Sequence, residues 1–184
     1  MDTHPDILIA GGGMVGATLA CALARPGRSI WLIERSVPPA WHEADPPNLR
    51  VSAISLANQQ YLDRIGIWPE IDPKRYTAYD SLATWEWLKT PWGVSLPPKQ
   101  ATRFHADELK VPHLGMIVEN RALQRAALDC AARQPGVKVL SGQSVDDLTW
   151  SDGRLNLSLD GHRMTPKLVV GADGAQSRIR DAAN

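Results

Sequence analysis

A glycine-rich stretch near the N-terminus has residue types and a spacing that suit phosphate binding. Gly11, Gly13 and Gly16 fit the pattern G-x-G-x-x-G, and Glu34 ends the next apolar run. In such a loop the first glycine permits a tight turn, the second lets the backbone approach a pyrophosphate, and the third lets a helix pack closely on a strand. A residue in the place of Glu34 accepts hydrogen bonds from ribose hydroxyls. The pattern indicates a dinucleotide site, and both nicotinamide and flavin dinucleotides satisfy it.

The elements needed to position this loop lie on either side of it. Residues 6–10 are an apolar run typical of a strand buried on both faces, and residues 14–25 form an Ala- and Leu-rich helical stretch that Pro26-Gly27 ends. Residues 29–34 supply a second apolar strand. A strand, helix and strand within about 30 residues make a βαβ unit, which predicts a parallel sheet. The complete unit weighs against the alternative in which the glycines only shape a turn.

The middle of the chain mixes loop, helix and strand signals. The prolines of residues 36–49 indicate an exposed loop. Apolar residues at helical spacing predict a helix over residues 54–65. Residues 81–88 alternate with a period of two, which predicts a strand with Trp85 and Trp87 on one face. We expect these two tryptophans to serve packing rather than catalysis.

Shorter signals follow this predicted strand. Residues 103–106 and 115–118 are weaker strand candidates. Asn120 is a suitable N-cap for a helix over residues 121–134, which Pro135-Gly136 closes.

The pattern of the last third of the chain predicts strands and turns. Asp-Gly turns separate apolar stretches and predict a three-stranded antiparallel meander. Its strands are expected at residues 144–150, 154–159 and 162–165, between buried strands at 137–140 and 167–170. The predicted class is therefore α/β: a Rossmann-like domain with a parallel sheet and a three-stranded meander.

Three later segments resemble a known family. Residues 50–55 (RVSAIS), 118–124 (VENRALQ) and 171–180 (GADGAQSRIR) are similar, in this order, to motifs of the class A flavin monooxygenases. Residues 84–87 (TWEW) and 108–110 (ELK) also resemble the ubiquinone-biosynthesis branch of that class, on the side of its demethoxyubiquinol-hydroxylating members. The resemblance covers nearly the whole chain and implies FAD as the cofactor.

The resemblance also implies roles for individual residues. Arg50 would lie against the flavin or the pyrophosphate, Gln124 would reach the FAD, and Asp173 would anchor the diphosphate-ribityl region, with Arg180 steadying that loop. Each residue has a plainer alternative. Arg50 could be a solvated surface arginine and Gln124 an exposed helix residue. Asp173 could simply cap a turn, and Ser177 reads as a helix-start residue.

The reaction implied by the resemblance is hydroxylation of a prenylated quinol or phenol ring by O₂, with NAD(P)H as electron donor. The cofactor carries such chemistry, and no residue in this sequence declares itself as an acid or base, so no catalytic residue is assigned. Two other functions remain open. One is an NAD-dependent reductase domain, which would explain the glycine motif and Glu34 alone. The other is a non-catalytic flavin-binding remnant or partner-binding module.

The same resemblance divides the chain. Residues 1–75 and 116–184 would be the first part of an FAD-binding domain, and residues 76–115 would begin a substrate-domain sheet inserted into it. In the family, the second flavin motif and most of the substrate domain follow the last strand predicted here. We therefore expect the chain to be a truncated, N-terminal portion with an incomplete hold on FAD.

Composition argues against nucleic-acid-binding, metal-binding and membrane-spanning proteins. Lys plus Arg and Asp plus Glu number 20 each, so no broad field favours nucleic acid. The five histidines make no metal-ligand pattern, and no metal is expected. Cys21 and Cys130 read as small buried hydrophobes in a reducing compartment. No signal peptide or membrane span is apparent. We expect a cytoplasmic protein, with any membrane contact peripheral at the inner face or through a biosynthetic complex.

Overall fold

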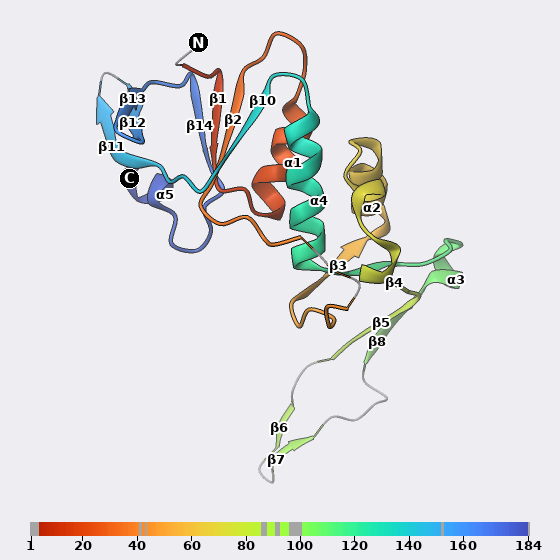
Figure 1. The fold of residues 1–184 in the computed structure, drawn as a ribbon. Coiled ribbons are helices and arrows are strands. Elements are labelled where there is room, and N and C mark those ends of the chain that lie inside the picture. The colour runs from red at the N-terminus through yellow and green to blue at the C-terminus, as the bar shows by residue number, and fades with distance from the viewer. Residues whose placement is uncertain are drawn as a thin grey trace.

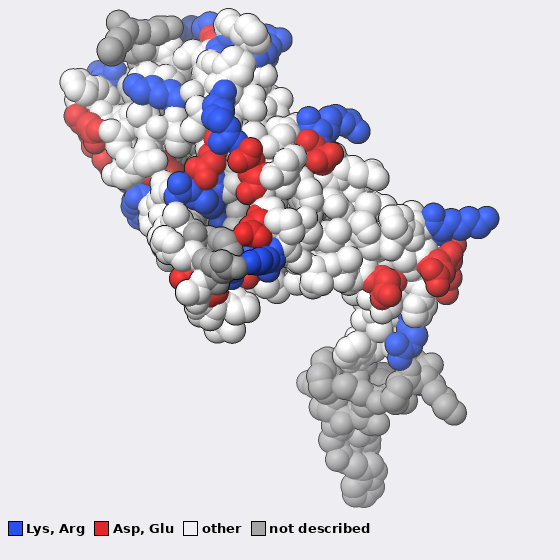
Figure 2. Space-filling view, turned by 45° about the vertical axis from the view of Figure 1, so that its right-hand side comes forward, with Lys and Arg blue, Asp and Glu red and all other residues white. Residues whose placement is uncertain are grey.

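The computed structural model describes residues 4–40, 42, 44–85, 88–90, 93–95, 101–151 and 153–183. Figure 1 shows a sheet packed between helices and a small meander, with a long arm that extends from the other end of the molecule. On the face shown in Figure 2, Lys and Arg are interspersed with Asp and Glu rather than gathered by sign.

A parallel sheet forms the centre of the body, as the sequence predicts, and it has four strands. Its order is β10-β2-β1-β14, with bounds β1 Ile7–Ala10, β2 Ile30–Glu34, β10 Val137–Ser141 and β14 Leu168–Gly171. Ala10 is level with Ile33 on one side and with Gly171 on the other. The carboxyl ends of these strands therefore meet at one edge, where open parallel sheets place their ligands.

Two layers cover the sheet. Helices α1 (Met14–Leu23) and α4 (Asn120–Arg133) pack on one face, and the meander packs on the other (Figure 1). Ile9 belongs to the core under the helices, whereas Leu8 belongs to the core under the meander, and both are fully buried. A strand that is apolar at successive positions is thus explained by burial on both faces.

The meander confirms the prediction of three antiparallel strands. They are β11 (Asp146–Ser151), β12 (Arg154–Leu159) and β13 (His162–Met164). Leu159 pairs with His162, so Asp160 and Gly161 alone make the turn, and both have positive φ angles of 50° and 76°. That geometry is the two-residue hairpin turn that Asp-Gly favours.

A second region lies beyond α4. Strands β3 (Val51–Ser55) and β4 (Tyr76–Tyr79) flank β9 (Gly115–Glu119) in an antiparallel sheet. The arm in Figure 1 consists of β5 (Ser81–Thr84) paired with β8 (Thr102–His105), and of β6 (Leu88–Thr90) paired with β7 (Gly93–Ser95). The helical elements are α2 (Leu56–Arg64), η1 (Trp68–Glu70), η2 (Pro73–Arg75), α3 (Ala106–Leu109) and α5 (Arg178–Ala183).

The start of the helix predicted over residues 54–65 is wrong. Residues 51–55 are strand β3, whose exposure alternates along its length, and the helix begins at Leu56. Pairing with β9 supplies the backbone hydrogen bonds of this segment. Ser55 then acts as the N-cap of α2, with its side chain accepting a hydrogen bond from the Asn58 N–H at 3.3 Å.

Two further predictions need correction. The N-cap of α4 is Glu119, not Asn120, because the Asn120 Oδ1 instead accepts a hydrogen bond from Ser52 Oγ at 2.7 Å. The strand predicted over residues 81–88 ends at Thr84, the last residue that pairs with β8. Trp85 is 52% exposed and therefore does not pack in a core. Trp87 lies outside the described residues.

The two cysteines are free and buried, on the facing helices α1 and α4, as the sequence predicts. Burial, with the neighbouring Cys130 thiol, raises the pKa of the Cys21 thiol to about 12. A thiol with so high a pKa is a poor nucleophile, so Cys21 packs as a small hydrophobe. In the described part of the chain, no helix is long and apolar enough to cross a bilayer.

Candidate cofactor-binding groove

The glycine loop connects β1 to α1, and two of its glycines are required by the packing of the protein itself. Gly11 has a φ of +103°, and a Cβ there would overlap the carbonyl of Ala172 at the end of β14. A Cβ at Gly16 would overlap the carbonyl oxygen of Gly11. Gly11 thus permits the turn and Gly16 permits the close approach of helix to strand, which are the roles predicted from the spacing.

Gly13 differs from both, because a Cβ there would meet nothing within 4 Å. It is the N-cap of α1, and no side chain caps this helix end. The first intrahelical bond runs from the Ala17 N–H to the Gly13 carbonyl at 3.0 Å. The N–H groups of the first turn therefore have no acceptor within the helix, and they carry the positive end of its dipole. This end suits a phosphate group.

Glu34 ends β2 beside this loop. Its Oε2 accepts a hydrogen bond from the Gly12 N–H at 2.6 Å, and its Oε1 accepts one from the Ser36 N–H at 2.8 Å. A Cβ at Gly12 would lie 2.7 Å from the Glu34 Cβ, so the middle glycine is needed as well, a role that the sequence did not reveal. Each carboxylate oxygen retains a further lone pair. Glu34 can therefore hold the loop and accept from a ribose hydroxyl at once.

Asp173 follows β14 at the same edge of the sheet. Its Oδ1 accepts from Ser177 Oγ at 2.5 Å and its Oδ2 accepts from the Arg178 N–H at 2.8 Å, where α5 begins. Burial would raise the pKa of the Asp173 carboxyl, but the hydrogen bonds from Ser177 and from backbone N–H groups outweigh it and lower the pKa. The plainer capping role is thus present within the protein. Ser177 caps the same helix, as predicted, by accepting from the Arg180 N–H.

The ionised form of Asp173 should contribute to stability. Its pKa is lowered on folding, so the contribution is present above the unfolded value of about 3.8 and is lost as pH falls through the folded pKa. We expect Asp173→Asn to lower the free energy of unfolding at pH 7 by less than about 1 kcal/mol, because the group is partly exposed. Thermal melts from pH 7 to pH 2.5 should show the difference between the two proteins shrinking below pH 4. A constant difference would contradict this role of the charge.

Gln124 reaches the loop from the second turn of α4. Its Nε2 donates to the carbonyl of Gly12 at 3.1 Å, which leaves its amide oxygen for another partner. Arg180 donates from Nη1 to the carbonyl of Ala175 at 3.2 Å and so braces the loop after β14, which is the role that the resemblance implies.

Arg50 lies near the glycine loop and is linked to it through α4. Its side chain is exposed, and its carbonyl accepts from the Asn120 N–H at 3.0 Å. Asn120 lies one helical turn before Gln124, or about 6 Å along α4. The backbone of Arg50 is therefore close to the point where Gln124 meets the glycine loop, although Arg50 does not line the groove described next.

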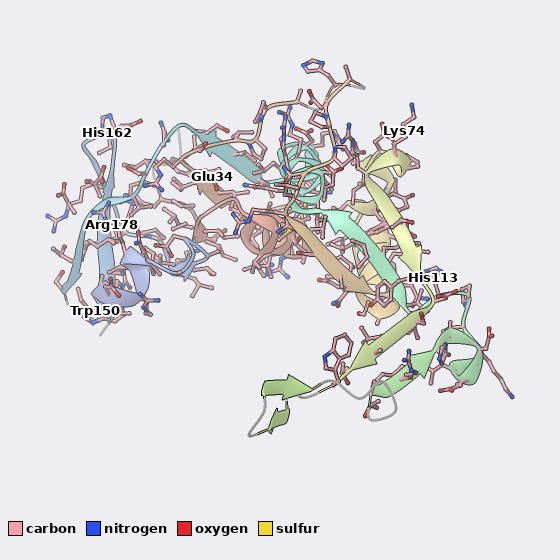
Figure 3. All side chains as sticks on the ribbon, turned by 90° about the horizontal axis from the view of Figure 1, so that it is seen from below. Glu34, Lys74, His113, Trp150, His162 and Arg178 are labelled. Carbon is pink, nitrogen blue, oxygen red and sulfur yellow. The ribbon has the colours of Figure 1, made fainter. Side chains whose placement is uncertain are left out.

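A groove of about 770 Å³ opens at the carboxyl edge of the sheet. Gly11, Gly13, Glu34 and Asp173 all line it, while Gly16 supports it from behind. Residues that the sequence analysis missed also line it: Arg35, Gln143, Ser144, Val145, Gln176 and Arg178. Arg178 donates from Nη1 to the Val145 carbonyl at 2.8 Å and so joins two walls of the groove. Figure 3 shows Glu34 and Arg178 on the same side of the molecule, away from the arm.

The lining fits a dinucleotide. The N-terminus of α1, which has no capping side chain and no acidic residue in its first turn, faces the groove at Gly13 and suits a pyrophosphate. The Glu34 carboxylate lies at the end of the neighbouring strand and suits a ribose. Among the residues that the structure describes, no group of three or more His, Cys, Asp or Glu side chains could hold a metal ion.

Comparison with known sequences identifies the family. The model of the FAD binding domain matches residues 4–184. The chain belongs to the FAD binding domain family. This chain is 38% identical to 3-demethoxyubiquinol 3-hydroxylase of Escherichia coli over 97% of its own length and 43% of that protein. It is 36% identical to the ubiquinone hydroxylase UbiL of Rhodospirillum rubrum over 99% of this chain and 40% of that protein. The resemblance to the ubiquinone-biosynthesis hydroxylases is confirmed.

Solved structures show the same fold. This FAD binding domain superposes on Pseudomonas aeruginosa PqsL bound to 2-aminobenzoylacetate with a TM-score of 0.68 at 21% identity, over 98% of this chain and 46% of that one. For p-nitrophenol 4-monooxygenase PnpA of Pseudomonas putida the TM-score is 0.70 at 19% identity. The match covers 100% of this chain and 44% of that one. The chain thus spans about two fifths of the length of the relatives it matches.

Proposed function

We propose that the chain is the FAD-binding part of a monooxygenase that hydroxylates a prenylated quinol or phenol ring in ubiquinone biosynthesis, using NAD(P)H and O₂. The observation that carries the proposal is the 38% identity to 3-demethoxyubiquinol 3-hydroxylase across 97% of the chain. The groove supports it, because Gly11, Gly13, Glu34 and Asp173 gather at one edge of the sheet.

In this proposal the chain binds and orients the cofactor. Gly11, Gly13 and the first turn of α1 receive the pyrophosphate, and Glu34 accepts from the adenosine ribose. Bound FAD would supply the redox chemistry. Asp173 holds the loop that faces the diphosphate-ribityl region, and Gln124 and Arg50 approach from the side of α4. No residue of this chain is assigned an acid or base role.

The domain assignment forms part of the proposal. Residues 1–75 and 116–184 would make the FAD-binding domain, and residues 76–115 would begin a substrate-binding sheet. In support, Leu82 and Phe104 are cross-strand partners in the two-stranded β5–β8 sheet, and they remain 47% and 45% exposed. Large apolar side chains paired on an open sheet face are usually covered by another layer in a complete domain.

The location is also proposed. A prenylated ring partitions into lipid, so its hydroxylase must collect it at a membrane surface or from a neighbouring enzyme. We propose a cytoplasmic protein with peripheral contact to the inner face of the membrane or to a biosynthetic complex.

A chimera tests the activity. The chain would replace the matched segment, 43% of the length, in the Escherichia coli relative, and the purified chimera would receive FAD, NADPH, O₂ and a short-tailed quinol. We expect hydroxylated product by mass spectrometry, and none from the 184-residue chain assayed alone. A chimera that binds FAD and oxidises NADPH but gives no product would contradict the proposed reaction. Product from the chain alone would contradict its dependence on the remaining part of the relatives.

Glu34 provides a test of the cofactor contacts. We expect Glu34→Ala to weaken FAD binding by about 1 to 3 kcal/mol, because the ribose hydroxyls and the Gly12 N–H both lose a charged acceptor. Glu34→Gln should weaken it less, since an amide oxygen remains. The measurement is a fluorescence titration with FAD, with Glu108→Ala on the exposed surface of α3 as the control. An unchanged affinity in Glu34→Ala would remove the residue from the site.

A further inference from the structure

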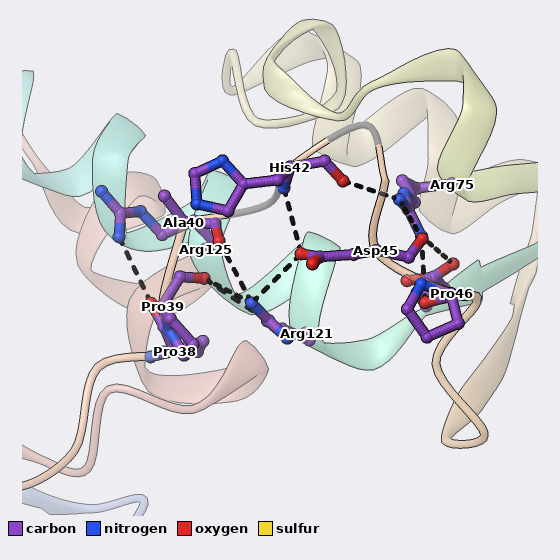
Figure 4. Close-up of polar contacts among 10 residues, drawn as sticks. Pro38, Pro39, Ala40, His42, Asp45, Pro46, Arg75, Arg121 and Arg125 are labelled. Atoms are coloured by element: carbon purple, nitrogen blue, oxygen red, sulfur yellow. Dashed lines mark hydrogen bonds and ion pairs between the residues drawn. The ribbon is translucent and has the colours of Figure 1, made fainter.

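The loop between β2 and β3 is held by arginine side chains rather than by regular structure. In its described part, residues 36–40, 42 and 44–49, there is no helix or strand. Arg125, Arg121 and Arg75 instead donate to its backbone (Figure 4). The accepting carbonyls are those of Pro38, Pro39, Ala40, His42, Asp45 and Pro46. We call these three side chains the arginine clamp.

Arg75 is the buried member of the clamp. Only 6% of the residue is exposed, and its Nη2 donates to the Asp45 carbonyl at 3.0 Å. Its charge is balanced by Glu119, with 3.1 Å between Arg75 Nη1 and Glu119 Oε1. Breaking such a pair leaves an uncompensated buried charge, so both partners have one strongly preferred position. The guanidinium therefore fixes the loop to the junction of β9 and α4.

This junction also lies next to residues that are proposed to hold the cofactor. Glu119 precedes Asn120, whose N–H is bonded to the Arg50 carbonyl at 3.0 Å, and one turn later Gln124 is bonded to Gly12. Pro46 is the last clamped residue of the loop, and Arg50 follows four residues later. The Arg50 side chain is exposed, and its backbone N–H donates to Asn48 Oδ1 at 2.9 Å, so the position of Arg50 depends on the short segment that follows the clamp.

We propose that Arg75, paired with Glu119, is a positioning residue that fixes the loop so that Arg50 is presented to the FAD. The proposal rests on the proposed role of Arg50 in holding the cofactor. Arg75 does not line the groove and need not touch FAD. A lysine at this position would keep the charge beside Glu119, but it lacks the planar fork that reaches the loop carbonyls.

A double-mutant cycle tests this proposal. FAD affinity would be measured by fluorescence titration for the wild type, Arg50→Ala, Arg75→Lys and the double variant. Arg133→Lys is the matched control, because Arg133 lies on α4 with Arg121 and Arg125 and pairs with Glu70 at 2.7 Å on the exposed surface. Hydrogen exchange over residues 36–49 would report whether Arg75→Lys has loosened the loop.

Arg75→Lys is expected to raise the Kd for FAD roughly tenfold when Arg50 is present, and less than about twofold in the Arg50→Ala background. Arg133→Lys should change neither the Kd nor the hydrogen exchange. An equal effect of Arg75→Lys in both backgrounds, or none in either, would overturn the positioning role. If Arg50→Ala alone leaves the Kd unchanged, the proposed role of Arg50 fails instead, which separates the two conclusions.

A second variant keeps the test decisive if Arg75→Lys does not fold. Arg121 is a partly exposed clamp residue whose Nη2 donates to the Ala40 carbonyl at 3.1 Å and lies 3.8 Å from the Asp45 carboxylate. Alanine is favourable in a helix, so Arg121→Ala should leave α4 intact. Its effect on FAD affinity should again be present with Arg50 and largely absent without it. Equal weakening in both backgrounds would show that the clamp acts only on stability.

Discussion

Gly16→Ala is expected to lower the free energy of unfolding by about 2 to 3 kcal/mol. The added Cβ would overlap the carbonyl oxygen of Gly11 and would lie 3.1 Å from the Cβ of Ala172. Both neighbours belong to the turn and the strand end against which α1 packs, so α1 cannot shift without opening the centre of the fold. In most helices the same substitution stabilises by up to about 1 kcal/mol. The sign of the change therefore tests the close approach directly.

Urea unfolding followed by circular dichroism would measure this change. Gly153→Ala is a suitable control, because a Cβ there meets nothing within 4 Å and only its φ of +70° resists the substitution. That strain should cost about 1 kcal/mol. A Gly16→Ala protein as stable as the wild type would show that α1 has room to move away from the turn, and the packing role given to Gly16 would be wrong.

The predictable part of the fold is the part with local signals. β1, α1 and β2 follow from two apolar runs around a glycine loop, and the turn at Asp160-Gly161 follows from two residue types. β3 was missed because Ile54 also fits a helical spacing, and only pairing with β9, far along the chain, decides for a strand. Non-local pairing carries such information, and a short window cannot show it.

Some residues of the candidate site can likewise be predicted from local sequence, and others depend on contacts between distant segments. The glycine positions and Glu34 are recognisable because their spacing reflects one βαβ unit. The need for Gly12 depends on its contact with Glu34, and Gln143 joins the groove because β10 lies next to β2 in the sheet. A rule that parallel strands place their carboxyl ends together would have pointed to the segment after β10, had the strand order been known. The arginine clamp has no sequence pattern, since its acceptors are backbone carbonyls.

Gly13→Val is expected to abolish measurable FAD binding while leaving the protein folded. At Gly13 the backbone is extended, with φ −64° and ψ 180°, which valine readily adopts. The ideal Cβ has no neighbour within 4 Å, so the side chain costs the protein no steric overlap. The space it enters is the groove at the end of α1. A bound pyrophosphate would have to occupy that space to accept from the helix N–H groups.

The contrast between two glycines of one motif makes this prediction sharp. Gly16→Ala should lose stability, whereas Gly13→Val should lose affinity by more than about a hundredfold, or about 2.7 kcal/mol, with only the small loss of stability that a less favourable N-cap residue brings. Gly13→Ala should fall between wild type and valine, because one methyl group displaces the phosphate less. The measurements are a flavin fluorescence titration and a urea melt on the same samples. A folded Gly13→Val protein that binds FAD as tightly as the wild type would place the pyrophosphate elsewhere, and the helix-end site would have to be abandoned.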